Sequence, residues 1–152
     1  MNTKSLAVIA ILLWGVTAAF VGFKFVKGST MTAEDGREAV VLDAGERAFI
    51  LTEMRGMLAA VQDILSAANA GDMAAVKDIA YQVGMAEVAG VPVQTMLKLP
   101  IEFKQLGKAT HVGFDDIGKA ADNGAKAVLE KLDENMSRCV ACHEGYQFTV
   151  AE

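Results

Sequence analysis

The residues near the end of the chain have the types and the spacing for covalent cofactor attachment. The chain holds only two cysteines, Cys139 and Cys142, and His143 directly follows the second one. The pattern Cys-x-x-Cys-His is the attachment signature of a c-type haem, in which both thiols add to vinyl groups and the imidazole binds the iron. On a helix the three residues share one face, because they stand at positions i, i+3 and i+4. The sequence therefore predicts one covalently bound haem c.

Other uses of the two cysteines fit the sequence less well. A structural zinc site needs four ligands, usually from two paired sets, and this chain has a single cysteine pair. A thioredoxin-like redox pair belongs near a strand–helix–strand unit, and the apolar spacing here shows no such pattern. A disulfide across Cys-x-x-Cys would close a very small loop and stabilise little. Haem attachment remains the preferred interpretation.

The N-terminal segment is long and apolar. The 18 residues from Leu6 to Phe23 carry no charge, with Lys4 before them and Lys24 after them. That length lies at the lower limit for crossing a hydrocarbon core of ~30 Å. A cleavable signal peptide is the alternative, although its apolar region is usually only ~7–15 residues and ends at an A-x-A-like site, which this segment lacks. We predict that residues 1–27 form a retained membrane anchor.

The rest of the chain reads as a linker followed by helices. Residues 28–42 are mostly polar and short of aromatic side chains, which predicts a linker. From residue 43 onward the apolar residues recur with helical spacing, and no segment alternates convincingly as a strand would. Four helices are expected, from about Asp43 to Asn69, Asp72 to Gly84, Ile101 to Ala121 and Ala125 to Tyr146. Four such helices with mostly short connections predict an all-α antiparallel four-helix bundle over residues 43–152, after a single transmembrane helix.

A family resemblance is carried by the motif and by its place in the last predicted helix. Residues 139–146 read Cys-Val-Ala-Cys-His-Glu-Gly-Tyr, with an aromatic residue three positions after the histidine. A looser match is the Met-x-x-Met of Met54 and Met57 in the first predicted helix, which precedes Gly71-Asp72. In these features the chain resembles the class II c-type cytochromes, the cytochrome c′ and cytochrome c-556 group, over about residues 43–148.

The chain departs from the family pattern at two positions. The family often has an arginine one turn before the distal position, where this chain has Ile50. An arginine or lysine commonly follows the terminal aromatic residue, and here that residue is Gln147. Both departures bear on how the helices are aligned with those of the family.

The resemblance implies which residue faces the open side of the iron. In the family this distal residue comes from the first helix, and counting back from Gly71 points to Met54. Met57 is the second candidate, and His111, at the border of the apolar face of the third predicted helix, is the third. A methionine ligand would suit electron transfer and raise the reduction potential. Without a sixth ligand the iron would be open to NO or CO.

These features predict a one-electron carrier. Residues 28–152 hold 11 basic and 19 acidic residues, a net charge of −8, which does not favour nucleic acid as a partner. Attachment of haem c takes place outside the cytoplasm, so the bundle is expected in a bacterial periplasm, anchored in the inner membrane or, after cleavage, soluble. We expect redox proteins as partners, with a homodimer as an open option.

The sequence bears on three further functions. An independent enzyme is not expected, because no convergent acid, base or nucleophile accompanies the expected haem ligands. A five-coordinate protein of the cytochrome c′ kind that binds or senses NO or CO is the main alternative. An anchored subunit whose haem serves one larger complex is the other.

Overall fold

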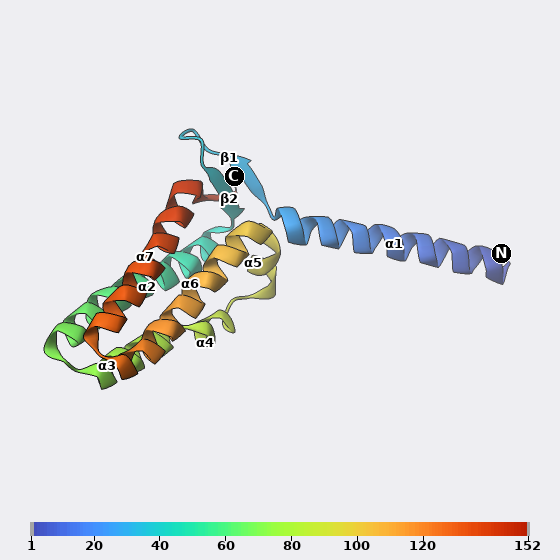
Figure 1. The fold of residues 1–152 in the computed structure, drawn as a ribbon. Coiled ribbons are helices and arrows are strands. Elements are labelled where there is room, and N and C mark those ends of the chain that lie inside the picture. Colours follow the sequence, from blue (N-terminus) through green and yellow to red (C-terminus); the bar gives the residue numbers. More distant parts are fainter. Residues whose placement is uncertain (1, 152) are drawn as a thin grey trace.

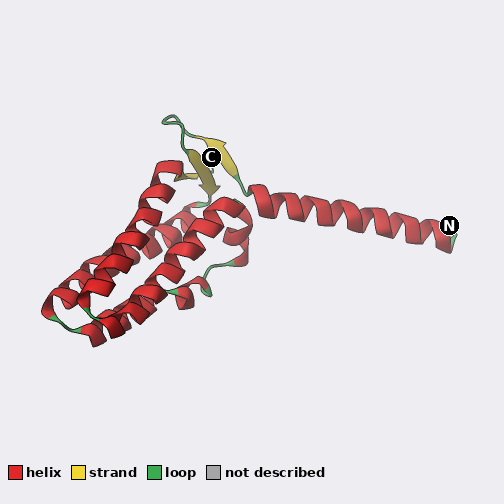
Figure 2. Ribbon diagram, in the orientation of Figure 1, coloured by secondary structure: helices red, strands yellow, loops and turns green. Residues whose placement is uncertain are grey.

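The computed structural model describes residues 2–151 and consists mostly of helices. One long helix projects from a domain of packed helices, and a small sheet lies at the end of the domain near that helix (Figure 1, Figure 2). The prediction of a mainly helical chain with an N-terminal apolar helix is therefore confirmed. The prediction that the chain has no strands is wrong, because three short strands form the sheet.

The N-terminal helix α1 spans Thr3–Lys27. Its 25 residues correspond to about 37 Å at 1.5 Å per residue, which exceeds a hydrocarbon core of ~30 Å. None of its described side chains is buried against the domain. The hydroxyl of Thr17 donates to the Leu13 carbonyl at 2.9 Å, so this polar group is satisfied within the helix. By length and composition α1 can cross a membrane, and a signal sequence can have the same length and apolar composition.

Four longer helices enclose the main core. They are α2 (Ala44–Ala70), α3 (Met73–Gln82), α6 (Ile101–Ala120) and α7 (Ala125–Gly145), each within about two residues of the predicted bounds. Asp43 begins α2 in a reciprocal capping box with Glu46, and Gly71 ends it in a left-handed conformation. A single 3₁₀ turn (Ala121–Asn123) and Gly124 join α6 to α7. The core side chains are Ala60, Ile64, Ala68, Val76, Ala80, Phe114, Ile117, Ala121, Val128 and Leu132.

Glycines of α6 allow its neighbours to approach closely. A Cβ added at Gly113 would overlap the side-chain oxygen of Asn135 on α7. One added at Gly118 would lie 3.0 Å from the Tyr81 ring of α3. The contact of α6 with α7 near Gly113 is therefore a close approach that a larger side chain would open.

The sheet joins two segments from opposite ends of the domain. Strands β1 (Thr30–Thr32) and β2 (Glu38–Leu42) form an antiparallel hairpin, and β2 pairs in parallel with β3 (Tyr146–Val150). Residues 28–42 are thus folded onto the domain, and their assignment as a linker is corrected here. Tyr146, predicted as the last residue of a helix, is instead the first residue of β3. The pairing satisfies the backbone groups of β3 after α7 ends, and it buries Val40 and Leu42.

A second apolar cluster lies beneath the sheet. Its buried members are Val40, Leu42, Ile50, Leu99 and Phe103. Half-buried side chains pack against them, namely Phe49, Met54, Met96, Cys142, Tyr146 and Phe148. The Phe103 ring makes edge contacts with both Tyr146 and Phe148, at centroid distances of 5.4 Å and 5.5 Å. The sheet, α2, α6 and the end of α7 therefore meet in one apolar environment.

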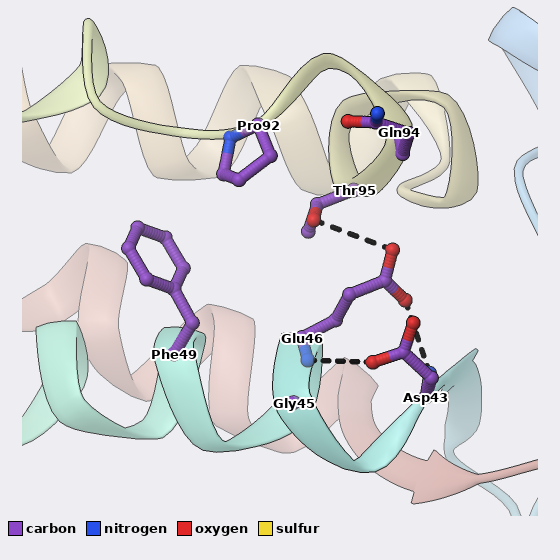
Figure 3. Close-up of a pocket in the computed structure, with 7 residues that line it drawn as sticks. All are labelled: Asp43, Gly45, Glu46, Phe49, Pro92, Gln94 and Thr95. Carbon is purple, nitrogen blue, oxygen red and sulfur yellow. Dashed lines mark hydrogen bonds between the residues drawn. The ribbon is translucent and has the colours of Figure 1, made fainter.

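Two short helices occupy the expected loop between α3 and α6. These are α4 (Met85–Val88) and α5 (Val93–Lys98). The carboxylate of Glu46, at the start of α2, accepts hydrogen bonds from Thr95 Oγ1 at 3.4 Å and from Lys98 Nζ. Figure 3 shows Thr95 directed toward Glu46 across a shallow hollow. These polar contacts attach α5 to the beginning of α2.

The end of α1 is attached directly to α5 and α6. Gly28 is buried with φ +67° and ψ −151°, a region that essentially only glycine adopts. The Ser29 amide donates to the Lys98 carbonyl at 2.7 Å. Lys104 Nζ lies 3.6 Å from the centroid of the Phe25 ring and donates to the Phe25 carbonyl at 2.6 Å. The junction between α1 and the domain is therefore packed and hydrogen-bonded.

Gly28→Ala is predicted to destabilise the domain more than Gly36→Ala. Both glycines have positive φ, so each alanine introduces backbone strain of about 1 kcal/mol. At Gly28 the added Cβ would also lie 2.6 Å from the Pro100 nitrogen, whereas nothing lies within 4 Å at Gly36. We expect a loss of about 3 kcal/mol for Gly28→Ala, measured by thermal unfolding in detergent. Equal losses for the two variants would show that the junction is not packed as described.

Candidate functional site

The C-terminal end of α7 presents the Cys-x-x-Cys-His motif. Cys139, Cys142 and His143 all lie on this helix, so the helical spacing expected from the sequence is present. Both cysteines are unpaired and half-buried, while His143 is exposed. Burial raises the pKa of the Cys139 and Cys142 thiols above the ordinary value. Both groups are therefore neutral thiols at pH 7, shielded by the helix and its neighbours.

Met54 shares the apolar surroundings of the motif. Its side chain, from α2, and that of Cys142, from α7, pack against the same cluster beneath the sheet. Met57 packs instead against the main core, together with Ile64 and its neighbours. Of these two methionines, Met54 packs against the cluster that Cys142 of the motif also contacts.

The His111 side chain is hydrogen-bonded to the end of α3. Its Nδ1 lies 2.8 Å from the carbonyl oxygen of Val83, the residue that ends α3. With Nδ1 as the donor, Nε2 is left as the only acceptor nitrogen of the ring. Val83 packs against the main core, so this hydrogen bond directs the imidazole toward the α3 end.

An open position on α6 lies level with the two cysteines. Gly107 stands on the buried stripe of α6 between Phe103 and Thr110, yet nothing lies within 4 Å of where its Cβ would be. The short connection makes α6 and α7 antiparallel. Gly113 of α6 and Asn135 of α7 are in close contact. Cys142 lies about 10 Å further along α7, and Gly107 lies about the same distance back along α6, so these two residues are at the same level. The absence of a side chain at Gly107 leaves room on the facing helix for a bulky group attached to the cysteines.

The Arg37 side chain caps the C-terminal end of α7, the helix that carries the motif. Its Nη1 donates to the carbonyls of His143 at 3.2 Å and Tyr146 at 3.3 Å, and its Nη2 donates to Gln147 Oε1 at 3.1 Å. A cation is favourable at a helix C-terminus, where the final carbonyls lack helical partners. Arg37 also pairs with Asp35. Arg37 was not predicted from the sequence as part of the site, because it lies in the segment expected to be a linker.

The basic side chains on α7 near the motif are paired locally. Arg138 donates to Glu134 at 2.7 Å and to Asn135 at 3.2 Å. Lys131 donates to the other oxygen of Glu134 at 2.8 Å. These two cations therefore stabilise their own helix, and Arg37 is the cation hydrogen-bonded to the motif backbone.

The grouping of potential metal-binding side chains bears on how a cofactor could be held. Within residues 2–151, no three His, Cys, Asp or Glu side chains are grouped so that they could hold a metal ion by themselves. A haem iron needs only one or two axial ligands from the protein, so it does not require such a group.

No protein-family model, curated protein or solved structure matches the chain. The resemblance to class II cytochromes thus rests on the motif and helix pattern of this chain.

A carboxyl pair lies beside Met54 and was not foreseen from the sequence. Glu53 on α2 and Glu87 on α4 are both half-buried and face each other. Burial, together with the hydrogen bond and the charge of Glu87, raises the pKa of Glu53 from 4.5 to about 7. The two carboxyl groups can therefore share one proton near neutral pH, which links α4 to α2.

Glu53→Gln is predicted to remove a pH-dependent loss of stability. The folded protein holds the Glu53 proton up to about pH 7, and the unfolded chain releases it near 4.5, so stability falls as pH rises between these values. The variant should unfold with a free energy on the order of 1 kcal/mol higher at pH 8, less than the full shift implies because water reaches the pair. Near pH 4 it should match the parent chain. Urea unfolding at both pH values, with Asp63→Asn as the control, measures this, and an equal effect at both would refute the coupling.

Proposed function

We propose that this chain is a one-electron carrier with one haem c, built on an antiparallel four-helix bundle of α2, α3, α6 and α7. The observation that carries the proposal is the placement of Cys139, Cys142 and His143 on the end of α7, with Cys142 in the same apolar cluster as Met54 of α2. When bound, the haem supplies an iron couple that takes up and releases a single electron.

The chain's own residues account for attachment and rigidity. Cys139 and Cys142 would form thioethers, each thiol giving its sulfur to one vinyl carbon and its hydrogen to the other. His143 would be the proximal ligand. Helix α7 continues unbroken through the motif, and Arg37 and β3 hold its end. Because these positions are fixed by secondary structure, little movement would accompany a change of oxidation state.

Met54 is the proposed distal ligand. It shares a cluster with Cys142, as Met96 of α5 also does and Met57 does not, and it lies on the helix from which the resemblance takes the distal residue. A thioether ligand raises the reduction potential. His111, by contrast, is directed toward Val83. A methionine in an apolar cluster also fits simple core packing, which favours five-coordinate binding of NO or CO as the second candidate function.

The proposed location of the carrier is a membrane. Helix α1 would anchor the chain in a bacterial inner membrane, and the chemistry of haem c attachment would put the domain in the periplasm. The packed junction at Gly28 and Lys104 favours redox partners in or at the same membrane over distant ones. The acidic surface of residues 28–152 would suit a basic face on such a partner.

Removing both cysteines is predicted to abolish covalent haem. Cys139→Ala/Cys142→Ala, expressed with the periplasmic haem-attachment machinery, should lose haem staining on a denaturing gel. Met54→Ala should keep it, because a non-covalent ligand is dispensable for thioether bonds. Staining that persists in the double variant, or that is absent from the parent chain, would contradict the proposed attachment.

The spin state identifies the distal ligand. Met54→Ala should convert a low-spin spectrum to a high-spin one and allow the ferrous protein to bind CO. The matched variants Met57→Ala and His111→Ala should remain low-spin, since their side chains lie in other surroundings. Absorption and EPR spectra make the comparison. A parent protein that is already high-spin and binds CO readily would replace the carrier with the gas-binding function.

A further inference from the structure

Helix α5 exposes two large apolar side chains to solvent, beside the polar Gln94. The side chain buried against α2 is the polar Thr95, which is 1% exposed and reaches Glu46. On the outer side Val93 is 72% exposed and Leu97 is 38% exposed. Met96 of the same helix packs against the apolar cluster beneath the sheet, so Val93 and Leu97 are further apolar side chains that remain exposed to water, which is unfavourable. The outer face of α5 is therefore suited to an apolar environment.

The sequence around α5 is also free of charge. The ten residues Val88 to Leu97 contain no Asp, Glu, Lys or Arg, and after α1 this is the longest such stretch in the chain. It belongs to a domain whose net charge is −8. A surface segment that lacks charge within such a domain would not be repelled by anionic lipid headgroups as the rest of the domain would.

Helix α5 lies where α1 leaves the domain. Figure 1 shows α5 at the side of the domain from which α1 projects, and these two helices contact each other. The Ser29 amide and the Lys98 carbonyl join the two segments at 2.7 Å, and buried Gly28 leaves no room for a shift. Helix α5 is therefore held at the end of α1 that carries Lys24 and Lys27, which end the apolar part of that helix. Lysines at the ends of a membrane helix mark the headgroup level.

We propose that α5 lies in the interfacial layer of the membrane that α1 crosses, with Val93 and Leu97 inserted beside the lipid headgroups. The inference rests on the membrane anchoring given in the proposed function. The occupant is the lipid bilayer, because a rigid junction holds α5 at the end of α1 where Lys24 and Lys27 mark the headgroup level, and α5 exposes Val93 and Leu97 there. Two contacts, α1 and α5, would fix the orientation of the domain, and with it the height of the α7 motif above the membrane.

The test uses the position of one tryptophan relative to lipid. The full chain with its haem is reconstituted into vesicles of phosphatidylethanolamine and phosphatidylglycerol, with or without bromine on the acyl chains near the headgroups. The chain has one tryptophan, Trp14, so Trp14→Phe gives a dark background. Val93→Trp is compared with Leu58→Trp, a control on α2 that is 66% exposed. Each variant is compared with itself in vesicles without bromine, so the haem is present in both measurements.

The outcomes distinguish the membrane contact of α5 from the membrane anchoring by α1. We expect bromine to quench Val93→Trp at least twofold more than Leu58→Trp. The parent chain, with Trp14, is measured in parallel in lipids brominated deep in the acyl chain. Quenching of Trp14 together with equal ratios for Val93→Trp and Leu58→Trp would overturn the interfacial contact and leave the anchor intact. If Trp14 is not quenched, the anchor itself is wrong, and the proposed contact of α5 falls with it.

Discussion

The parallel pairing of β2 with β3 is the constraint on which the functional end of this protein depends. It joins residues 38–42 to residues 146–150, and so links the chain just before α2 to the chain just after α7. Arg37 strengthens the same link by donating to the backbone at the end of the motif helix. Because of this pairing, the exit of α1, the start of α2 and the Cys-x-x-Cys-His motif all lie at one end of the domain (Figure 1).

The helices could be predicted from the sequence because their signals are local. Apolar spacing, the capping residues Asp43 and Asp72, and the turn after Gly71 place the bounds within about two residues. The sheet depends on contacts between segments about a hundred residues apart. Residues 38–42 read Glu-Ala-Val-Val-Leu and do not alternate, whereas residues 146–150 do alternate, as Tyr-Gln-Phe-Thr-Val. That alternation was the available signal for a strand, and it was hidden because it directly follows a helix.

The candidate site likewise contains residues that local spacing predicts and residues that only tertiary contacts bring together. Cys139, Cys142 and His143 follow from their spacing alone, since a helix must bring them to one face. Met54 and Met57 stand three residues apart on one helix, so their spacing could not separate them; their different apolar clusters do. Arg37 and the Glu53–Glu87 pair act across elements, and no local pattern in the sequence indicates such contacts. Tertiary packing thus supplies the surroundings of a motif whose chemistry is predicted from the sequence.

The central claim is that the end of α7 carries one covalently bound haem. The most direct measurement is the intact mass of the full chain, expressed with periplasmic haem attachment and purified from membranes, under conditions that unfold the protein. The account predicts a mass equal to the polypeptide plus one haem, with a tryptic peptide containing Cys139 and Cys142 carrying the whole increase. A mass equal to the polypeptide alone, with two free thiols in that peptide, would contradict it.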